Sequence, residues 1–122
     1  MSDMVNQSKY SATYLRFLNL VQAIREIPTF PAMDPVEERL LTMLAGVWHL
    51  EKKISVLEAM SLTHEISATT AHRRLKTLRK KGMIDLDTDQ SDSRVKYVVP
   101  TALAKQYFTT LGQALDKAQH AV

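Results

Sequence analysis

Apolar residues recur at helical spacing along most of this 122-residue chain and at strand spacing in one short stretch. From residue 10 to residue 24 they occupy positions i, i+4, i+7, i+8, i+11 and i+14, which lie on one broad face of a helix. Similar patterns follow further along. The sequence predicts helices over residues 9–27, 35–53, 55–62, 67–81 and from 101 onward.

Residues that favour helix ends stand at the boundaries of these segments. Pro35 suits the first helical position, and Glu58 completes an S-x-x-E capping box. Gly82 is expected to end the fourth helix in the left-handed conformation. Three prolines in residues 27–35 predict an extended linker after the first helix. The expected N-caps are Asp34, Ser55, Ser67 and Thr101.

After Gly82 the apolar period changes from 3.6 to 2, which predicts two short strands. Residues 88–93 between them (TDQSDS) are turn formers or polar, so the strands form a hairpin with a polar tip. Ile54 is a candidate for a further strand of one or two residues. In the first strand the alternating apolar residues are Ile84 and Leu86. In the second they are Val95, Tyr97 and Val99, which alternate with Lys96 and Val98.

The order of elements predicts the fold class. A helix, a linker, three helices, a hairpin and a final helix form a mainly α protein with a small β-hairpin (α+β), in the winged helix-turn-helix arrangement. We expect a helical arm over residues 1–30, a winged helix-turn-helix domain over residues 31–100 and a C-terminal helix over residues 101–122. Both terminal helices carry apolar faces that include aromatic residues. The simplest interpretation is that these faces form part of the core, and the next is that they form a two-fold dimer contact.

The charge distribution indicates the partner more clearly than the total does. The net charge is only +3, yet residues 72–81 supply +6 and contain no acid, so the rest of the chain is net acidic. Positive charge concentrated on one helix is typical of a protein that binds a polyanion. The alternative is a solvated helix face, although such a face usually mixes both signs. The basic residues are Arg73, Arg74, Lys76, Arg79, Lys80 and Lys81.

Residues 69–84 (TTAHRRLKTLRKKGMI) closely resemble the recognition helix and first wing strand of MarR-type transcriptional regulators. Residues 89–94 are similar to the wing-tip pattern D-x-x-D-x-R of that family, and residues 99–101 match the opening of its next helix. The resemblance covers roughly residues 35–115. It implies a winged helix that binds double-stranded DNA as a homodimer, with Arg94 in the minor groove.

The residue types on the basic helix suit contact with DNA. Thr69, Thr70 and Arg73 are candidates for base edges, because Arg bonds two acceptors of guanine at once. Arg74 and Lys76 are candidates for phosphate contacts, which position a protein on DNA without reading sequence. The alternative is that these are exposed helix residues. The full candidate set is Ser67, Thr69, Thr70, His72, Arg73, Arg74, Lys76, Thr77, Arg94 and Lys96.

The function predicted by the sequence is a sequence-specific regulator of transcription that binds double-stranded DNA. A winged-helix module for protein interaction and a replication or partition DNA-binding protein remain alternatives. A small-molecule effector is possible in the family, but no pattern identifies one.

Several other classes are not favoured. The chain has no cysteine, and its four histidines are scattered without metal-ligand spacing. No Gly-flanked nucleophile or phosphate-binding loop is present, so we expect no enzymatic activity, cofactor or metal. We expect a cytoplasmic protein without a membrane span, because no apolar run approaches 18 residues and the N-terminus lacks a signal-peptide pattern.

Overall fold

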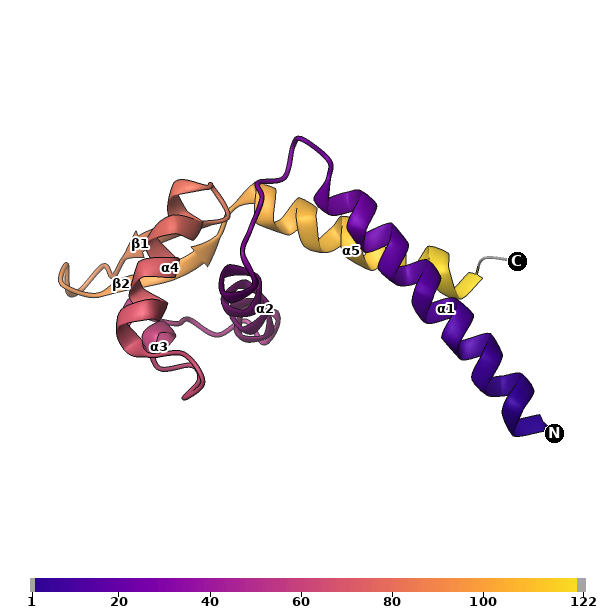
Figure 1. The fold of residues 1–122 in the computed structure, drawn as a ribbon. Coiled ribbons are helices and arrows are strands. Elements are labelled where there is room, and N and C mark those ends of the chain that lie inside the picture. Colours follow the sequence, from indigo (N-terminus) through magenta and orange to yellow (C-terminus); the bar gives the residue numbers. More distant parts are fainter. Residues whose placement is uncertain (1, 121–122) are drawn as a thin grey trace. The chain divides into compact units, whose positions relative to one another are not determined.

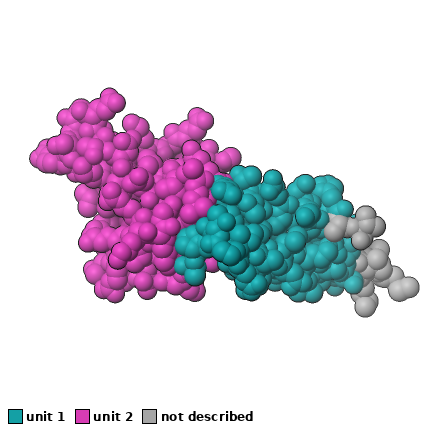
Figure 2. All heavy atoms as spheres, turned by 90° about the horizontal axis from the view of Figure 1, so that it is seen from above, with its two compact units in different colours: residues 1–32, 106–122 teal, residues 33–105 magenta. Residues whose placement is uncertain are grey.

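The computed structural model describes residues 2–120, and it has the predicted order of elements (Figure 1). Contacts divide the chain into two compact units, residues 33–105 and residues 1–32 with 106–122 (Figure 2). The predicted fold class, mainly α with a small hairpin, is confirmed. The elements are α1 (Ser2–Arg25), α2 (Pro35–His49), α3 (Val56–Met60), α4 (Ala68–Lys80), β1 (Ile84–Thr88), β2 (Lys96–Pro100) and α5 (Ala102–His120).

The unit of residues 33–105 is a winged helix-turn-helix around one apolar core. Asp34 is the N-cap of α2: its side chain accepts a hydrogen bond from the Glu37 N–H, while the Glu37 carboxylate accepts from the Asp34 N–H. Ser55 and Glu58 form the same reciprocal capping box at the start of α3, as predicted. The largest fully buried apolar side chains are Leu40, Leu41, Leu44, Leu78, Met83, Ile84 and Val98.

The hairpin packs one face into this core. Leu86 pairs with Val98, while Asp85 and Asp87 pair with residues on the opposite, outer face. Val98 is therefore the buried residue of β2 at 1% exposure, and the sequence pattern, which grouped Val99 with Tyr97, did not single it out. Its neighbours explain the burial: the Trp48 indole N–H donates to the Val98 carbonyl, at 3.0 Å. The Val98 N–H donates to the Ile54 carbonyl at 2.8 Å.

Two helix boundaries differ from the sequence prediction. Helix α1 begins at Ser2 rather than at residue 9, because a helix that has been nucleated gains a backbone hydrogen bond with each further residue and needs no apolar stripe to extend. Helix α2 ends at His49 rather than near residue 53. Its end is marked by Glu51, which has a positive φ of 57°, and by a hydrogen bond from the Lys52 N–H to the Val47 carbonyl.

The other unit consists of α1, the linker and most of α5. Its buried residues include Val21 and Ile24 on α1 and Phe30 in the linker, whose ring meets the Tyr107 ring edge-on at 5.1 Å. Alanines form much of the buried face of α5, whereas Leu115 is 46% exposed. The described residues of α5 buried in this unit are Tyr107, Ala114 and Ala118.

The apolar stripe of α1 is buried only in its C-terminal half. Tyr10 and Tyr14 are 69% and 60% exposed, and Leu18 is 41% exposed. The expectation that this whole stripe forms core is therefore wrong within this chain. Among residues 2–120, no helix has the length and apolar character that crossing a bilayer requires.

Candidate nucleic-acid interface

Helix α4 is fixed at both ends and along one face. The Ser67 hydroxyl accepts a hydrogen bond from the Thr70 N–H at 3.1 Å, so Ser67 is the N-cap, as predicted. At the other end Gly82 has a positive φ of 80°, and the Met83 N–H donates to the Leu78 carbonyl. The apolar residues of the helix, Ala71, Leu75 and Leu78, are buried as expected.

The opposite face of α4 carries four exposed polar residues, Thr69, Arg73, Lys76 and Lys80, which we call the exposed row. Their spacing of i, i+4, i+7 and i+11 extends roughly 16 Å along the helix. None of the four side chains has a hydrogen bond or ion pair with any residue that the structure describes. Three uncompensated cations on one helix face form a surface suited to a polyanion.

The remaining three basic residues of the helix and its cap are paired with acids. The Arg74 Nε lies 3.2 Å from the Asp34 carboxylate, and the Lys81 Nζ lies 2.7 Å from the Glu37 carboxylate. Arg79 lies 3.5 Å from Asp85 on β1. The basic run of the sequence is thus divided by the fold into a row of free cations and a set of paired ones.

Glu37 is the buried acid at the centre of this arrangement, with 1% exposure. Its carboxylate accepts hydrogen bonds from the Lys81 ammonium, the Thr77 hydroxyl at 2.7 Å and the Asp34 N–H at 2.9 Å. Burial raises the pKa of Glu37, but these hydrogen bonds and the Lys81 charge outweigh it and hold the pKa below its ordinary value. The D-x-x-E spacing of Asp34 and Glu37 is a sequence signal for the capping box, but not for the burial of Glu37.

The other residues predicted to contact DNA differ in whether their side chains already have a partner within the chain. The Thr77 hydroxyl donates to Glu37, so Thr77 lies between α4 and α2 rather than on the exposed row. Thr70 accepts a hydrogen bond from the Ser67 hydroxyl at 2.9 Å, and Lys96 donates to Thr88 at 2.8 Å. His72 is half-buried on the flank of the helix.

The wing tip is organised by two aspartates. Asp89 accepts hydrogen bonds from Ser91, from the Asp92 N–H and from the Tyr97 hydroxyl at 2.8 Å. The Ser91 hydroxyl, the Tyr97 hydroxyl and the backbone amides lower the pKa of Asp89 to about 2. Asp92 binds the Arg94 guanidinium through both oxygens, at 3.0 and 3.2 Å. Arg94 nevertheless stays 88% exposed.

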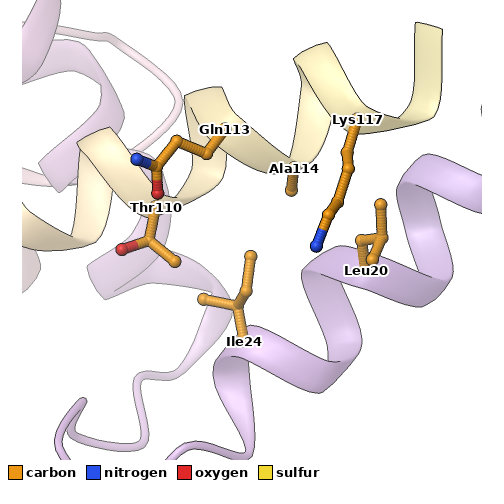
Figure 3. A pocket seen from close by; sticks show the side chains of 6 residues that line it. All are labelled: Leu20, Ile24, Thr110, Gln113, Ala114 and Lys117. Atoms are coloured by element: carbon orange, nitrogen blue, oxygen red, sulfur yellow. The ribbon is translucent and has the colours of Figure 1, made fainter. Parts of the chain in front are cut away.

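A groove of about 310 Å³ lies in the other unit, between α1 and α5 (Figure 3). Its walls are mainly apolar, and the Lys117 side chain extends across it toward Leu20. No pattern in the sequence predicted it. The lining residues are Leu20, Ile24, Thr110, Gln113, Ala114 and Lys117.

Solved structures with the same fold are transcriptional regulators and a heme sensor. The heme sensor protein PefR from Streptococcus agalactiae is 26% identical, with a TM-score of 0.57 over 95% of this chain and 71% of that chain. A probable transcriptional regulator from Pseudomonas aeruginosa is 16% identical, with a TM-score of 0.57 over 98% of this chain and 79% of its own. The transcriptional regulator Tm0710 from Thermotoga maritima is 12% identical, with a TM-score of 0.59 over 94% of this chain and 72% of that chain.

Sequence comparison alone does not reach this assignment, because the chain matches no family model and no curated protein. The structural neighbours are MarR-family proteins, and their fold agrees with the residue pattern of α4 and the wing. The chain therefore has the winged helix-turn-helix fold of MarR-type transcriptional regulators, in agreement with the resemblance of its residues 69–84 to their recognition helix.

Proposed function

We propose that this protein is a sequence-specific transcriptional regulator that binds double-stranded DNA as a homodimer. The observation that carries the proposal is the exposed row of α4, three cations and a threonine on one helix face without partners in the described chain. The major groove of DNA, about 12 Å wide, admits one helix, and its base edges present acceptors to Arg. A helix with its apolar side in the core and its cations outward suits that groove.

Each member of the exposed row has a role that follows from its position. Thr69 and Arg73 lie near the N-terminus of α4, the end that reads base edges in helix-turn-helix proteins, so we assign them to base contacts. Lys76 and Lys80 lie further along and suit phosphates. Arg94 is assigned to the minor groove, where narrow A/T-rich DNA attracts Arg. Its pair with Asp92 is exposed, and such pairs contribute only about 0–1 kcal/mol, so DNA competes with it easily.

The dimer proposal is supported by the uncovered apolar surface of the helical unit. Tyr10, Tyr14 and Leu18 on α1 and Leu115 on α5 are each more than two-fifths exposed. Large apolar side chains grouped on helices favour burial against another surface. A second copy of the chain supplies an identical surface, and two-fold pairing sets two DNA half-sites about 10 base pairs apart.

An effector is not assigned. PefR is described as a heme sensor, but the groove of Figure 3 is lined by no His, Met or Cys, the side chains that most often ligate heme iron. We therefore do not extend heme binding to this groove.

The test is a salt titration of binding to duplex DNA, followed by fluorescence anisotropy. Because each phosphate contact contributes about −0.9 to the slope of log affinity against log salt, we expect a steep slope for the wild type. Arg73→Ala should weaken binding by about 1–3 kcal/mol on DNA fragments selected from a genome, since Arg73 is assigned to bases. The matched control is Lys105→Ala, an exposed cation on α5 outside the exposed row.

Two outcomes contradict the proposal. A flat salt response by the wild type means that the basic row does not meet DNA, and the protein-interaction alternative then takes its place. Equal losses in Arg73→Ala and Lys105→Ala mean that only net charge matters.

A further inference from the structure

Two acids at the start of α2 hold two cations that belong to α4 and its cap. Glu37 accepts the Lys81 ammonium at 2.7 Å, and its own side chain is only 2% exposed. Asp34 lies 3.2 Å from the Arg74 guanidinium, and each of these two side chains is 34% exposed. Both acids lie at the N-terminus of α2, where the positive end of the helix stabilises negative charge.

These pairs differ from the pairs at the surface. Moving Lys81 to a phosphate leaves the Glu37 charge buried without its cation, which is strongly unfavourable. Opening the pair of Arg79 with Asp85 costs little, because its side chains are 55% and 62% exposed. A phosphate can therefore replace Asp85 as the partner of Arg79, but it cannot readily replace Glu37 as the partner of Lys81.

We propose that Asp34 and Glu37 are positioning residues that withhold Arg74 and Lys81 from the DNA backbone. This inference rests on the proposed function and refines it, because it states how many phosphates α4 neutralises. A phosphate contact strengthens binding to DNA of every sequence alike. By restricting contact to the exposed row and Arg79, the two acids keep binding to arbitrary DNA weak and leave Arg73 and Thr69 to distinguish sites.

Conservative variants test this without removing the helix cap. Asn is as good an N-cap as Asp, so Asp34→Asn keeps the start of α2. Gln replaces Glu in the capping box, so Glu37→Gln keeps the acceptor for the Asp34 N–H. Asp87→Asn is the matched control: it makes the same change in net charge on exposed β1, and its side chain has no partner among the described residues.

The measurement is the salt dependence of binding to a mixed-sequence duplex of about two helical turns. Each cation that is freed to meet a phosphate should steepen the slope of log affinity against log salt by about 0.9. For two variants of equal affinity at about 1 M salt, this difference in slope corresponds to roughly eightfold tighter binding at about 0.1 M salt. The Asp87→Asn slope should stay close to that of the wild type. In the wild-type background, Arg74→Gln should leave the slope unchanged, whereas Lys76→Gln should reduce it by about 0.9.

The inference is overturned if Asp34→Asn and Glu37→Gln behave like Asp87→Asn, or if they bind less tightly than the wild type. It is also overturned if Arg74→Gln and Lys76→Gln lower the slope equally. A steep wild-type slope with these results leaves the proposed function intact, whereas a flat wild-type slope refutes the proposed function itself. Circular dichroism checks folding, and if Glu37→Gln is unfolded, Asp34→Asn and Arg74→Gln decide the question.

Discussion

Two helices of this protein end in the same backbone geometry with different residues at the critical position. The residue after the C-cap is Gly82 in α4, with φ of 80°, and Glu51 in α2, with φ of 57°. In both, the next N–H bonds back to a carbonyl five residues earlier, from Met83 to Leu78 and from Lys52 to Val47. We predict that Gly82→Ala destabilises the protein and that Glu51→Gly stabilises it.

The magnitude follows from the backbone alone. A side chain added at Gly82 meets no atom within 4 Å, so no steric clash contributes. An L-residue in the left-handed region costs about 1–2 kcal/mol, while glycine loses about 0.5–1 kcal/mol of additional chain entropy on folding. The net expectation is a change of roughly 1 kcal/mol or less at each position, with opposite signs. The Glu51 side chain has no partner in the described chain, so its removal has no other cost.

The assay is urea unfolding followed by the fluorescence of Trp48, the single tryptophan of the chain. Trp48 reports on the unit that contains both helix ends, because its indole N–H donates to Val98. Protein concentration must be held constant, since association shifts the apparent stability. A control is Gly46→Ala inside α2, where an added Cβ also meets open space and helix propensity predicts a gain of about 0.5–1 kcal/mol.

The reasoning is refuted by either of two results. A Gly82→Ala midpoint at or above the wild-type value means that the positive φ is not what selects glycine there. A Glu51→Gly midpoint below the wild-type value means that Glu51 makes a stabilising contribution that outweighs its backbone conformation.

Three further predictions concern the core, the wing and the dimer. Leu44→Ala should lower stability by about 2–5 kcal/mol in the same urea assay, because Leu44 is fully buried. The pKa of Asp89 is lowered to about 2 from 3.8, so its stabilising hydrogen bonds persist above about pH 4 and are lost as the pH falls toward 2. The NMR resonance of the Ser91 amide should therefore shift between about pH 4 and about pH 2 in the wild type, and it should not shift in Asp89→Asn. Tyr14→Lys should weaken self-association in sedimentation experiments without affecting the winged unit, and an unchanged dimer would exclude the exposed face of α1 from the interface.

The features predicted from sequence are those set by local chemistry. The caps at Asp34, Ser55 and Ser67, the stop at Gly82 and the buried row of α4 depend on residues within one or two turns, and each is confirmed. The polar wing tip belongs to the same class, because Asp92 and Arg94 are only two residues apart.

The features missed depend on residues distant in sequence. The burial of Glu37 requires Thr77 and Lys81, which lie 40 and 44 residues further along the chain. For the same reason the sequence did not divide the basic run into free and paired cations, since the pairing acids lie on α2 and β1. The burial of Val98 likewise depends on contacts from Trp48 and Ile54, which a local alternation pattern does not contain.

The wing has a firmly anchored base and a self-contained tip. At the base, the Thr101 hydroxyl donates to the Gly82 carbonyl at 2.6 Å, and both backbone groups of Val98 are bonded, the N–H to the Ile54 carbonyl and the carbonyl to the Trp48 indole. The turn beyond β1 is held chiefly by its own members, Asp89 with Ser91 and Asp92 with Arg94. The tip is consequently a segment that evolution or an engineer can lengthen, shorten or exchange, while the rest of the domain keeps its sequence and its fold.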